Sequence, residues 1–269
     1  MGYQHLEITQ DDHVATLWLN RPDKHNALSE DMWADIPSAV ADLNTDETVR
    51  VIVLAARGPS FTVGIDVSML AGLQSQGRSA AESNLTLYNR ILELQQTASC
   101  FADSPKPIIA AIHGYCLGAG IDLITACDIR LASEDATFSV RETKMGLVAD
   151  IGSLQRLPGI VGSGVTAEMA YTGGDYTARW SKERGLVNEV CHDGVSLITA
   201  ASTLAKRIAA NSPLVTRGIK KVLSAGEGRT VNEALDYVAQ WNSSFLFSND
   251  LTEAVAAFME KREPDFTGT

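Results

Sequence analysis

The spacing of apolar residues along the chain predicts a parallel β-sheet preceded by a hairpin. Residues 5–20 alternate between apolar and polar positions on either side of Asp11 and Asp12, as the two strands of a β-hairpin do. Residues 49–55 and 108–112 are instead almost continuously apolar, which is typical of parallel strands covered on both faces. Because helical patterns separate these runs, we expect an α/β fold with largely parallel pairing.

Apolar residues at helical spacing predict two long helices in the first half of the chain. The first spans about 30–43, with Ser29 as its N-cap, and Pro37 inside it disfavours a regular helix. The second spans roughly 80–101. A further helical stretch is expected after the loop that ends at Asp66.

The last quarter of the chain is helical in pattern throughout. Its predicted helices span 195–210, 213–224, 230–246 and 249–261. We therefore divide the chain into a main domain at 1–193 and a C-terminal helical region at 194–269.

Charge and composition exclude several classes of protein. The 269 residues carry a formal net charge of −11, which disfavours nucleic acid as a partner because like charges repel. The longest apolar run, 108–127, is interrupted by His113, by glycines and by Asp122. We expect a buried core segment there and no membrane span.

Two features of the sequence predict a cytoplasmic protein. The first residues lack the basic and apolar segments of a signal peptide. The cysteines have no paired spacing, which favours a reducing compartment and argues against a metal cluster. They are Cys100, Cys116, Cys127 and Cys191.

Residues 108–152 combine a strand, a glycine-bearing turn and three carboxylates. The strand leads through Gly118 and Gly120 into a short apolar helix that we expect to end near Asp128. Such a turn leaves backbone N–H groups without intrahelical partners. Bare donors beside acidic groups suit proton transfer next to a developing oxyanion. The carboxylates are Asp122, in the first helical turn, Glu142 and Asp150.

Five motifs, in their order and spacing, resemble the crotonase (enoyl-CoA hydratase/isomerase) superfamily over nearly the whole chain. They are Asn20-Arg21-Pro22 with Asn26-Ala27-Leu28, and residues 61–66, 113–120, 126–128 and 155–158. The set Asp122, Glu142 and Asp150 is most similar to the Δ3,5-Δ2,4-dienoyl-CoA isomerase branch, since hydratases usually have Glu at the first position and Gly at the third. Ala119 departs from the Gly of many members.

The resemblance implies a crotonase-like ββα spiral core at 1–193 that carries an acyl-CoA site. The C-terminal helical region at 194–269 would serve oligomerisation, giving a homotrimer or a hexamer. The resemblance also implies that no metal or redox cofactor is needed, since coenzyme A is part of the substrate.

By position in the family motifs, the backbone N–H groups of Ile65 and Ala119 would form an oxyanion hole. The same resemblance implies a set of substrate-binding residues: Val63, Gly64, Ile65, Asp66, Val67, Ala119, Gly120 and Lys24. The CoA phosphates would meet Lys24, His25 and Arg21, or Lys261 or Arg262 of this or a neighbouring subunit. The alternative is that Gly118 and Gly120 merely permit a tight strand-to-helix turn.

The activity implied is conversion of 3,5-dienoyl-CoA to 2,4-dienoyl-CoA in fatty-acid β-oxidation, by proton transfer between C2 and C6. We assign Glu142 to C2 and Asp150 to C6, although the two roles could be exchanged. Asp122 would be auxiliary, orienting Asp150 or raising its pKa by like charge.

Each carboxylate also has a purely structural explanation. Asp150 could be the N-cap of a helix at 152–157, Asp122 a partner of a helix dipole, and Glu142 one side of a surface ion pair. His113 is interpreted as a core histidine whose hydrogen bonds are satisfied, not as a base.

Two other functions remain open. A 2-enoyl-CoA hydratase would use Asp122 and Glu142 around a water. A member of the same fold without catalysis would serve assembly or RNA binding, against which the charge and the three carboxylates speak.

Overall fold

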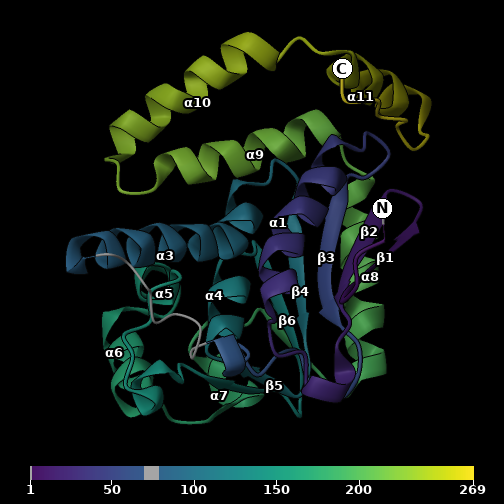
Figure 1. Ribbon diagram of the computed structural model, residues 1–269. Coiled ribbons are helices and arrows are strands. Elements are labelled where there is room, and N and C mark those ends of the chain that lie inside the picture. The colour runs from purple at the N-terminus through teal and green to yellow at the C-terminus, as the bar shows by residue number, and fades with distance from the viewer. Residues whose placement is uncertain (1, 70–78) are drawn as a thin grey trace.

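The computed structural model describes residues 2–69 and 79–269 and has a six-stranded sheet at its centre (Figure 1). The first two strands form the expected antiparallel hairpin, and the later neighbours pair in parallel. In spatial order the strands are β1 (Leu6–Asp11), β2 (Val14–Leu19), β3 (Val51–Ala56), β4 (Ile108–Ile112), β6 (Ile129–Ser133) and β9 (Glu189–Cys191). The helical stretch expected after Asp66 lies for the most part outside the described residues.

A second, three-stranded sheet brings distant loops to one place. It consists of β5 (Tyr115–Leu117), β7 (Thr137–Ser139) and β8 (Tyr176–Thr177). Two isolated bridges, Thr62 with Cys116 and Leu28 with Ile65, extend this arrangement toward the N-terminal part of the chain. As a result, the loops around residues 28, 65 and 118 meet beside one another.

Helices α1 (Glu30–Thr45) and α3 (Ala80–Asp103) pack against each other over one face of the central sheet (Figure 1). Ser29 caps α1 as predicted, accepting from the N–H of Met32. Pro37 does not interrupt α1, contrary to the concern that the sequence raised. Because Pro37 has no N–H, the carbonyl of Trp33 lacks its helical donor, and the hydroxyl of Thr97 on α3 donates to it instead at 2.8 Å.

Short helices connect the strands of the lower half. They are the one-turn η1 (Pro22–Lys24) and η2 (Glu142–Met145), with α4 (Ala119–Thr125), α5 (Ser153–Val161), α6 (Ser163–Thr172) and α7 (Ala178–Glu183). Helix α4 ends before the predicted end near Asp128, because the N–H groups of Ala126 and Cys127 bond three residues back and tighten its last turn.

Helix α8 (Gly194–Ala209) covers the other face of the central sheet. Leu197, Ala201 and Ala205 are buried with Val53 and Ile109 in one apolar cluster. The predicted boundary at 193/194 therefore does not separate two packing units, since α8 belongs to the sheet layer. The periodicity marked it as a helix but could not show which surface it covers.

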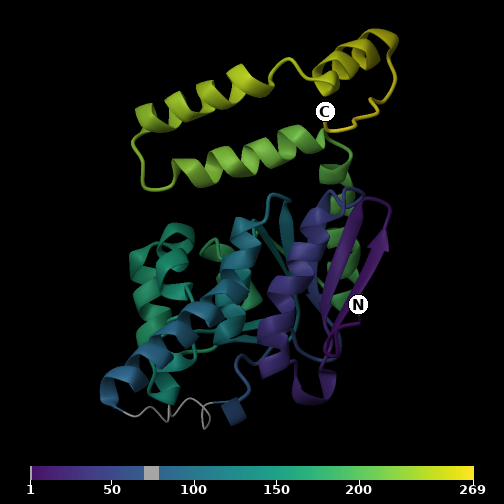
Figure 2. The same cartoon turned by 45° about the horizontal axis from the view of Figure 1, so that its top comes forward.

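Helices α9 (Pro213–Gly226), α10 (Val231–Phe245) and α11 (Asn249–Glu260) form a layer beyond the sheet (Figure 2). No α10 residue is buried in the single chain. None of the helices in the described ranges is both long and apolar enough to cross a membrane.

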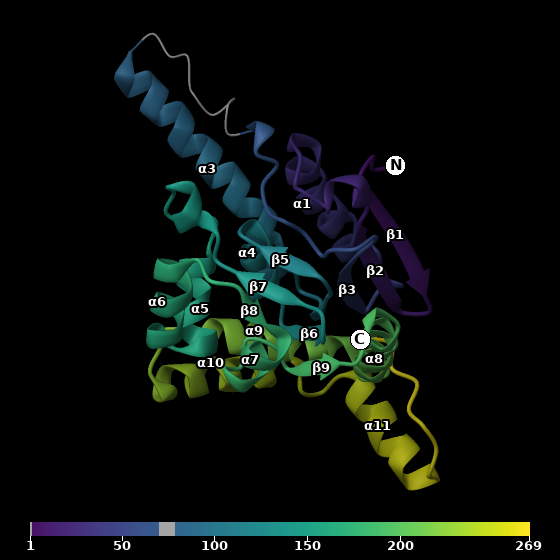
Figure 3. The ribbon, with the colours of Figure 1, turned by 90° about the horizontal axis from the view of Figure 1, so that it is seen from below.

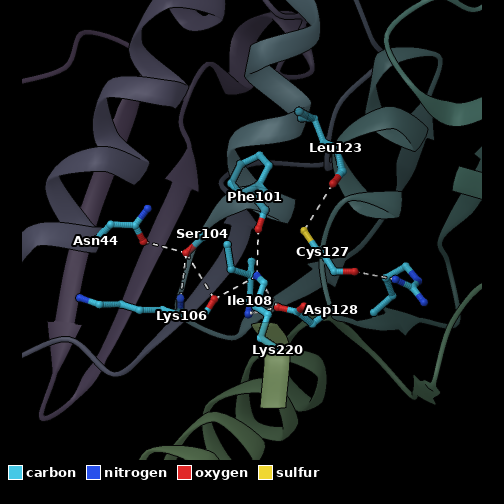
Figure 4. Close-up of polar contacts among 10 residues, drawn as sticks. Asn44, Phe101, Ser104, Lys106, Ile108, Leu123, Cys127, Asp128 and Lys220 are labelled. Atoms are coloured by element: carbon cyan, nitrogen blue, oxygen red, sulfur yellow. Dashed lines mark hydrogen bonds and ion pairs between the residues drawn. The ribbon is translucent and has the colours of Figure 1, made fainter. Parts of the chain in front are cut away.

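A polar junction joins this layer to the sheet domain (Figure 4). The ammonium of Lys220 on α9 donates to the carbonyls of Phe101 and Lys106, at 3.0 and 3.1 Å, and pairs with Asp128 at 2.8 Å. Asp128 also accepts from the N–H of Ile108 at 2.7 Å, at the start of β4. One side chain of α9 thus contacts the end of α3, the segment before β4, and the segment between α4 and β6.

Candidate active site

A pocket of about 490 Å³ opens between α1, α3 and the loops that follow β3 and β7. Of the predicted substrate-binding residues, five line it: Val63, Gly64, Ile65, Val67 and Ala119. Its apolar wall includes Trp33, Leu87, Ile91, Leu94, Met145 and Leu147. Arg141, Glu142 and Asp150 supply its charged groups. Helix α3, part of this wall, projects past the rest of the body (Figure 3).

Two glycine turns approach each other in the wall of this pocket. Gly64 has φ of +92° and Gly118 has φ of +54°, conformations that favour glycine. A Cβ on Gly64 would lie 2.9 Å from the carbonyl oxygen of Leu117 and 3.4 Å from the nitrogen of Ala119. The close approach of the two backbones therefore requires glycine at position 64.

The turns leave two backbone donors available. Ala119 is the first residue of α4, so its N–H has no intrahelical acceptor. Among the described residues, neither this N–H nor that of Ile65 donates to a protein acceptor. Both residues line the pocket. The geometry thus provides two free donors beside one cavity, which is what an oxyanion hole requires.

Glu142 lies next to these donors. A Cβ on Gly118 would stand 3.4 Å from its Oε1, and its Oε2 is buried without a hydrogen-bond partner in the described chain. Burial is the main cause that raises the pKa of Glu142, and the charge of Asp150 raises it further. A carboxyl group with a raised pKa is better suited to hold and return a proton than an ordinary glutamate.

Asp150 faces the same pocket from the segment before α5. The N-cap of α5 is Gly152, and no side chain caps that helix, so Asp150 is not an N-cap. The amide of Gln95 on α3 donates to its backbone carbonyl at 2.7 Å. Partial burial raises the pKa of the Asp150 carboxyl.

Asp122 lies behind the pocket and not in its wall. It is only 1% exposed. Its Oδ1 accepts from the N–H of Ser153 at 2.5 Å, while its Oδ2 has no partner among the described groups. Burial, followed by the charge of Glu142, raises its pKa to about 7, and the nearby Arg156 opposes this rise.

Asp66 and Gly120 were both predicted to bind substrate, and neither lines the pocket. Asp66 is engaged by Arg21 at 2.7 Å. A Cβ on Gly120 would lie 2.8 Å from the Thr62 side chain, so this glycine permits close packing of α4. Lys24, also expected at the substrate, is exposed and outside the pocket wall.

Two of the other proposed phosphate ligands are already paired with groups of the protein. The His25 ring is paired with the hydroxyl of Ser60 at 3.1 Å, and Arg262 pairs with Glu253 and Glu260.

His113 is half-buried, with its Nε2 at 2.8 Å from the carbonyl of Gly58. It is therefore hydrogen-bonded as expected, although it is not a fully buried core residue.

Comparison with known proteins identifies the family. The family described as enoyl-CoA hydratase/isomerase matches residues 9–269. The chain belongs to this family. The crotonase resemblance and the crotonase-type fold expected from the sequence are thereby confirmed.

Individual relatives show which members of this family the chain resembles. The chain is 42% identical to the peroxisomal Delta(3,5)-Delta(2,4)-dienoyl-CoA isomerase of Arabidopsis thaliana, over 98% of both chains. It is 40% identical to the mitochondrial enzyme of that name from Dictyostelium discoideum, over 98% of this chain and 92% of that one. A crystal structure of an enoyl-CoA hydratase from Bacillus anthracis superposes with a TM-score of 0.90 at 30% identity, covering 99% of this chain and all of that one.

These names correct one prediction. We expected a cytoplasmic protein, whereas the relatives are named peroxisomal or mitochondrial. Cysteines without paired spacing favour a reducing compartment, but this pattern does not distinguish the cytosol from other reducing compartments. The prediction is therefore wrong.

Sequence reasoning missed most of the apolar pocket wall. Trp33, Leu87, Ile91 and Leu94 come from the two long helices, and Met145 and Leu147 from η2 and the turn after it. Leu87 is 38% exposed although it lies on a helix next to the core. One signal in the sequence could have revealed this wall: the helix predicted at 80–101 has apolar residues on its exposed side, and some of them line the pocket.

Proposed function

We propose that the protein converts 3,5-dienoyl-CoA to 2,4-dienoyl-CoA thioesters. The observation that carries this function is that Glu142 and Asp150 line the same pocket as Ile65 and Ala119. Removal of a proton from C2 would generate a conjugated enolate whose charge reaches the thioester oxygen. The two backbone N–H groups would bind that oxygen, and a carboxylic acid would then protonate C6.

We assign proton removal at C2 to Glu142, which lies beside the turn at Gly118. Asp150 would deliver the proton to C6. The raised pKa values of both carboxyl groups support this exchange, because a proton can then be held by one group while the other is ionised. Deuterium incorporation tests the assignment: in D₂O, Asp150→Asn should still exchange the C2 hydrogen, and Glu142→Gln should not.

The relatives support the same reaction. Curated proteins named dienoyl-CoA isomerases are 37–42% identical to this chain over at least 97% of its length. That similarity extends through both carboxylate segments and the C-terminal helices. The 2,4-dienoyl product would enter fatty-acid β-oxidation.

The position of Asp122 argues against the hydratase alternative. A hydratase of this fold would direct two carboxylates at one water in the pocket. Here Asp122 is buried behind the pocket wall and accepts from the N–H of Ser153. Asp150, where hydratases usually have glycine, is the second acid that faces the cavity.

The reaction scheme uses no metal ion and no redox cofactor. Two double bonds move along the conjugated chain, so that no electrons are lost or gained overall, and coenzyme A enters as part of the substrate. Treatment with a chelator followed by desalting should therefore leave the rate unchanged. We propose that Val63, Gly64, Ile65, Val67 and Ala119, which line the pocket, bind the thioester, and that the exposed Lys24 meets its CoA portion.

A panel of three acyl-CoA classes tests the proposed function. Purified protein is incubated with 3,5-dienoyl-, 2-enoyl- and 3-enoyl-CoA, and the ultraviolet spectrum is followed. Isomerisation of the first compound should create the longer-wavelength absorbance of a dienoyl thioester conjugated with the carbonyl. Loss of enoyl absorbance from the second compound, without reaction of the first, would show a hydratase.

We also propose that α9–α11 carry contacts between subunits of a homotrimer or hexamer. Phe247, Phe258 and Met259 are 93%, 81% and 75% exposed in the single chain. An apolar pocket of about 440 Å³ lies between these helices and includes Trp241 and Phe245. Burial of such surface by a second copy would be favourable.

A further inference from the structure

The loop that carries the Ile65 donor is held in one register by its neighbour. The N–H of Leu28 donates to the carbonyl of Gly64 at 2.8 Å, and the N–H of Asp66 donates to the carbonyl of Leu28 at 3.0 Å. Residues on either side of Ile65 thus face Leu28. Because backbone groups alternate in direction along an extended segment, the N–H of Ile65 faces the opposite side, toward the turn of Gly118 and Ala119.

The side chain of Asp66 fixes the far end of this loop. Its Oδ2 accepts from Nη1 of Arg21 at 2.7 Å, and its Oδ1 accepts from the backbone N–H and the hydroxyl of Ser68, at 3.1 and 2.7 Å. The side chains of Arg21 and Asp66 are only 17% and 19% exposed. Arginine lowers the pKa of Asp66 to about 2, so the carboxylate stays charged at any working pH.

Arg21 connects Asp66 to the Asn20-Arg21-Pro22 motif. The same Nη1 donates to the carbonyl of Ala27 at 3.0 Å, one residue before Leu28. Nη1 of the guanidinium is therefore engaged by two groups of the protein itself. Ala27 and Asp66 are joined through this one nitrogen.

Asn26 completes the connection from within the core. It is fully buried, with φ of +53°. Its Oδ1 accepts from the N–H of Arg21 at 2.6 Å, and its Nδ2 donates to the carbonyls of Arg57 and Ser60, both at 2.8 Å. Its carbonyl accepts from the hydroxyl of Thr62 at 2.6 Å. Both ends of the loop at 57–66 are thus tied to residues 21–28.

We infer that Arg21 and Asp66 are a positioning pair: by fixing this loop, they hold the N–H of Ile65 beside the N–H of Ala119, where both can bind one oxygen. This assignment rests on the proposed enolate chemistry. Neither side chain lines the pocket, so the pair acts through the backbone of Ile65. A donor displaced by about 1 Å can cost roughly 100-fold in rate. Loss of the pair should therefore weaken enolate binding more than binding of a neutral thioester.

A ligand that forms an enolate without turnover separates these effects. Acetoacetyl-CoA binds as an enolate with a distinct near-ultraviolet absorbance wherever an oxyanion hole stabilises that form. Saturated octanoyl-CoA reports ground-state binding alone. We would compare wild type, Arg21→Met, Asp66→Asn and the double variant, with Asp11→Asn as the control, because it breaks the Lys206–Asp11 pair away from this loop.

Each single variant should reduce the bound enolate fraction about tenfold, equivalent to about 1.4 kcal/mol. The double variant should lose little more, because the two residues act as one unit. The affinity for octanoyl-CoA should stay within about twofold, and Asp11→Asn should match wild type. Arg21→Lys, which keeps the charge, should recover part of the enolate signal and serves if Arg21→Met does not fold.

An unchanged enolate fraction in the variants, with only a lower melting temperature, would overturn the positioning role. A parallel loss of octanoyl-CoA affinity would also overturn it, since the pair would then bind CoA directly. An enolate signal in wild type without dienoyl-CoA turnover would refute the proposed function and leave the pair's role standing. Absence of that signal in wild type would refute the oxyanion hole and the pair together.

Discussion

Asp122 and Ser153 join two parts of the site through one hydrogen bond of 2.5 Å, from the backbone N–H of Ser153 to Oδ1 of Asp122. Asp122 lies in the first turn of α4, three residues after the Ala119 donor, and Ser153 begins α5, three residues beyond Asp150. Because α5 has no side-chain cap of its own, this carboxylate satisfies one of its free N–H groups. The bond thus ties the Asp150 segment to the turn that carries Ala119.

The buried charge of Asp122 should make stability depend on pH. The pKa of Asp122 is about 7 in the folded protein against an ordinary value of 3.8. Between these values the folded state binds more protons than the unfolded state, so the free energy of unfolding falls as pH rises, by up to about 1.4 kcal/mol per pH unit. Asp122→Asn keeps an acceptor for Ser153 and removes the titration.

Urea unfolding of wild type and Asp122→Asn at several pH values checks this. The variant should gain relative stability from about pH 4 to pH 7, and the difference should level off above the folded pKa. Parallel stability curves for the two proteins would show that Asp122 titrates normally.

The Ala119 donor can be removed with little disturbance of its helix. Ala119 is the first residue of α4, the helical position where proline is best tolerated. Ala119→Pro should therefore keep the fold and lower kcat by about 10²–10³-fold. Ala119→Gly, which retains the N–H, is the matched control and should remain close to wild type. Equal kinetics of the proline variant and wild type would refute the donor role.

Lys106 should give the opposite pH dependence from Asp122, at higher pH. Its side chain is fully buried, its Nζ donates to the carbonyls of Leu43 and Asp46, and burial lowers its pKa to about 8 from 10.5. Between these values the unfolded state binds more protons, so Lys106 makes the free energy of unfolding rise with pH.

Comparison with Lys106→Met isolates this contribution from the buried thiols, such as Cys116, whose raised pKa acts in the other direction. The stability difference, wild type minus variant, should increase from about pH 8 to pH 10. A difference that is constant over this range would contradict the lowered pKa.

If the protein assembles through its C-terminal helices, a charge introduced on their exposed apolar surface should disrupt the oligomer, whereas a charge introduced elsewhere should not. Phe258 on α11 is 81% exposed in the single chain, and Phe258→Glu should shift the protein toward monomers in sedimentation velocity runs. Val195→Glu, on α8 with 79% exposure, is the control and should leave the distribution unchanged. A wild-type protein that sediments as a monomer would refute the proposed assembly.

Much of the fold was predictable because its signals are local. The β3 and β4 strands appear as unbroken apolar runs, and Ser29 marks the start of α1. The three carboxylates were recognised through the family motifs. Their geometry was not predictable, because it depends on contacts between distant segments. Nothing in the local sequence places Asp122 against Ser153, or Arg21 against Asp66.

Long-range packing also explains what the sequence assigned differently. Helix α8 looks like the helices after it, yet its small residues Ala201 and Ala205 fit against the sheet. Pro37 is tolerated because Thr97, sixty residues away, supplies the missing donor. Arg21 was expected at a phosphate and instead pairs with Asp66.

The most direct test of the account is the rate at which wild type and Asp150→Asn form 2,4-dienoyl-CoA from 3,5-dienoyl-CoA. Wild type should turn over, and the variant should lose about 10²–10⁴-fold in kcat while its melting temperature and its affinity for a saturated acyl-CoA stay close to wild type. A near wild-type rate in Asp150→Asn, or no dienoyl product from wild type, would contradict it.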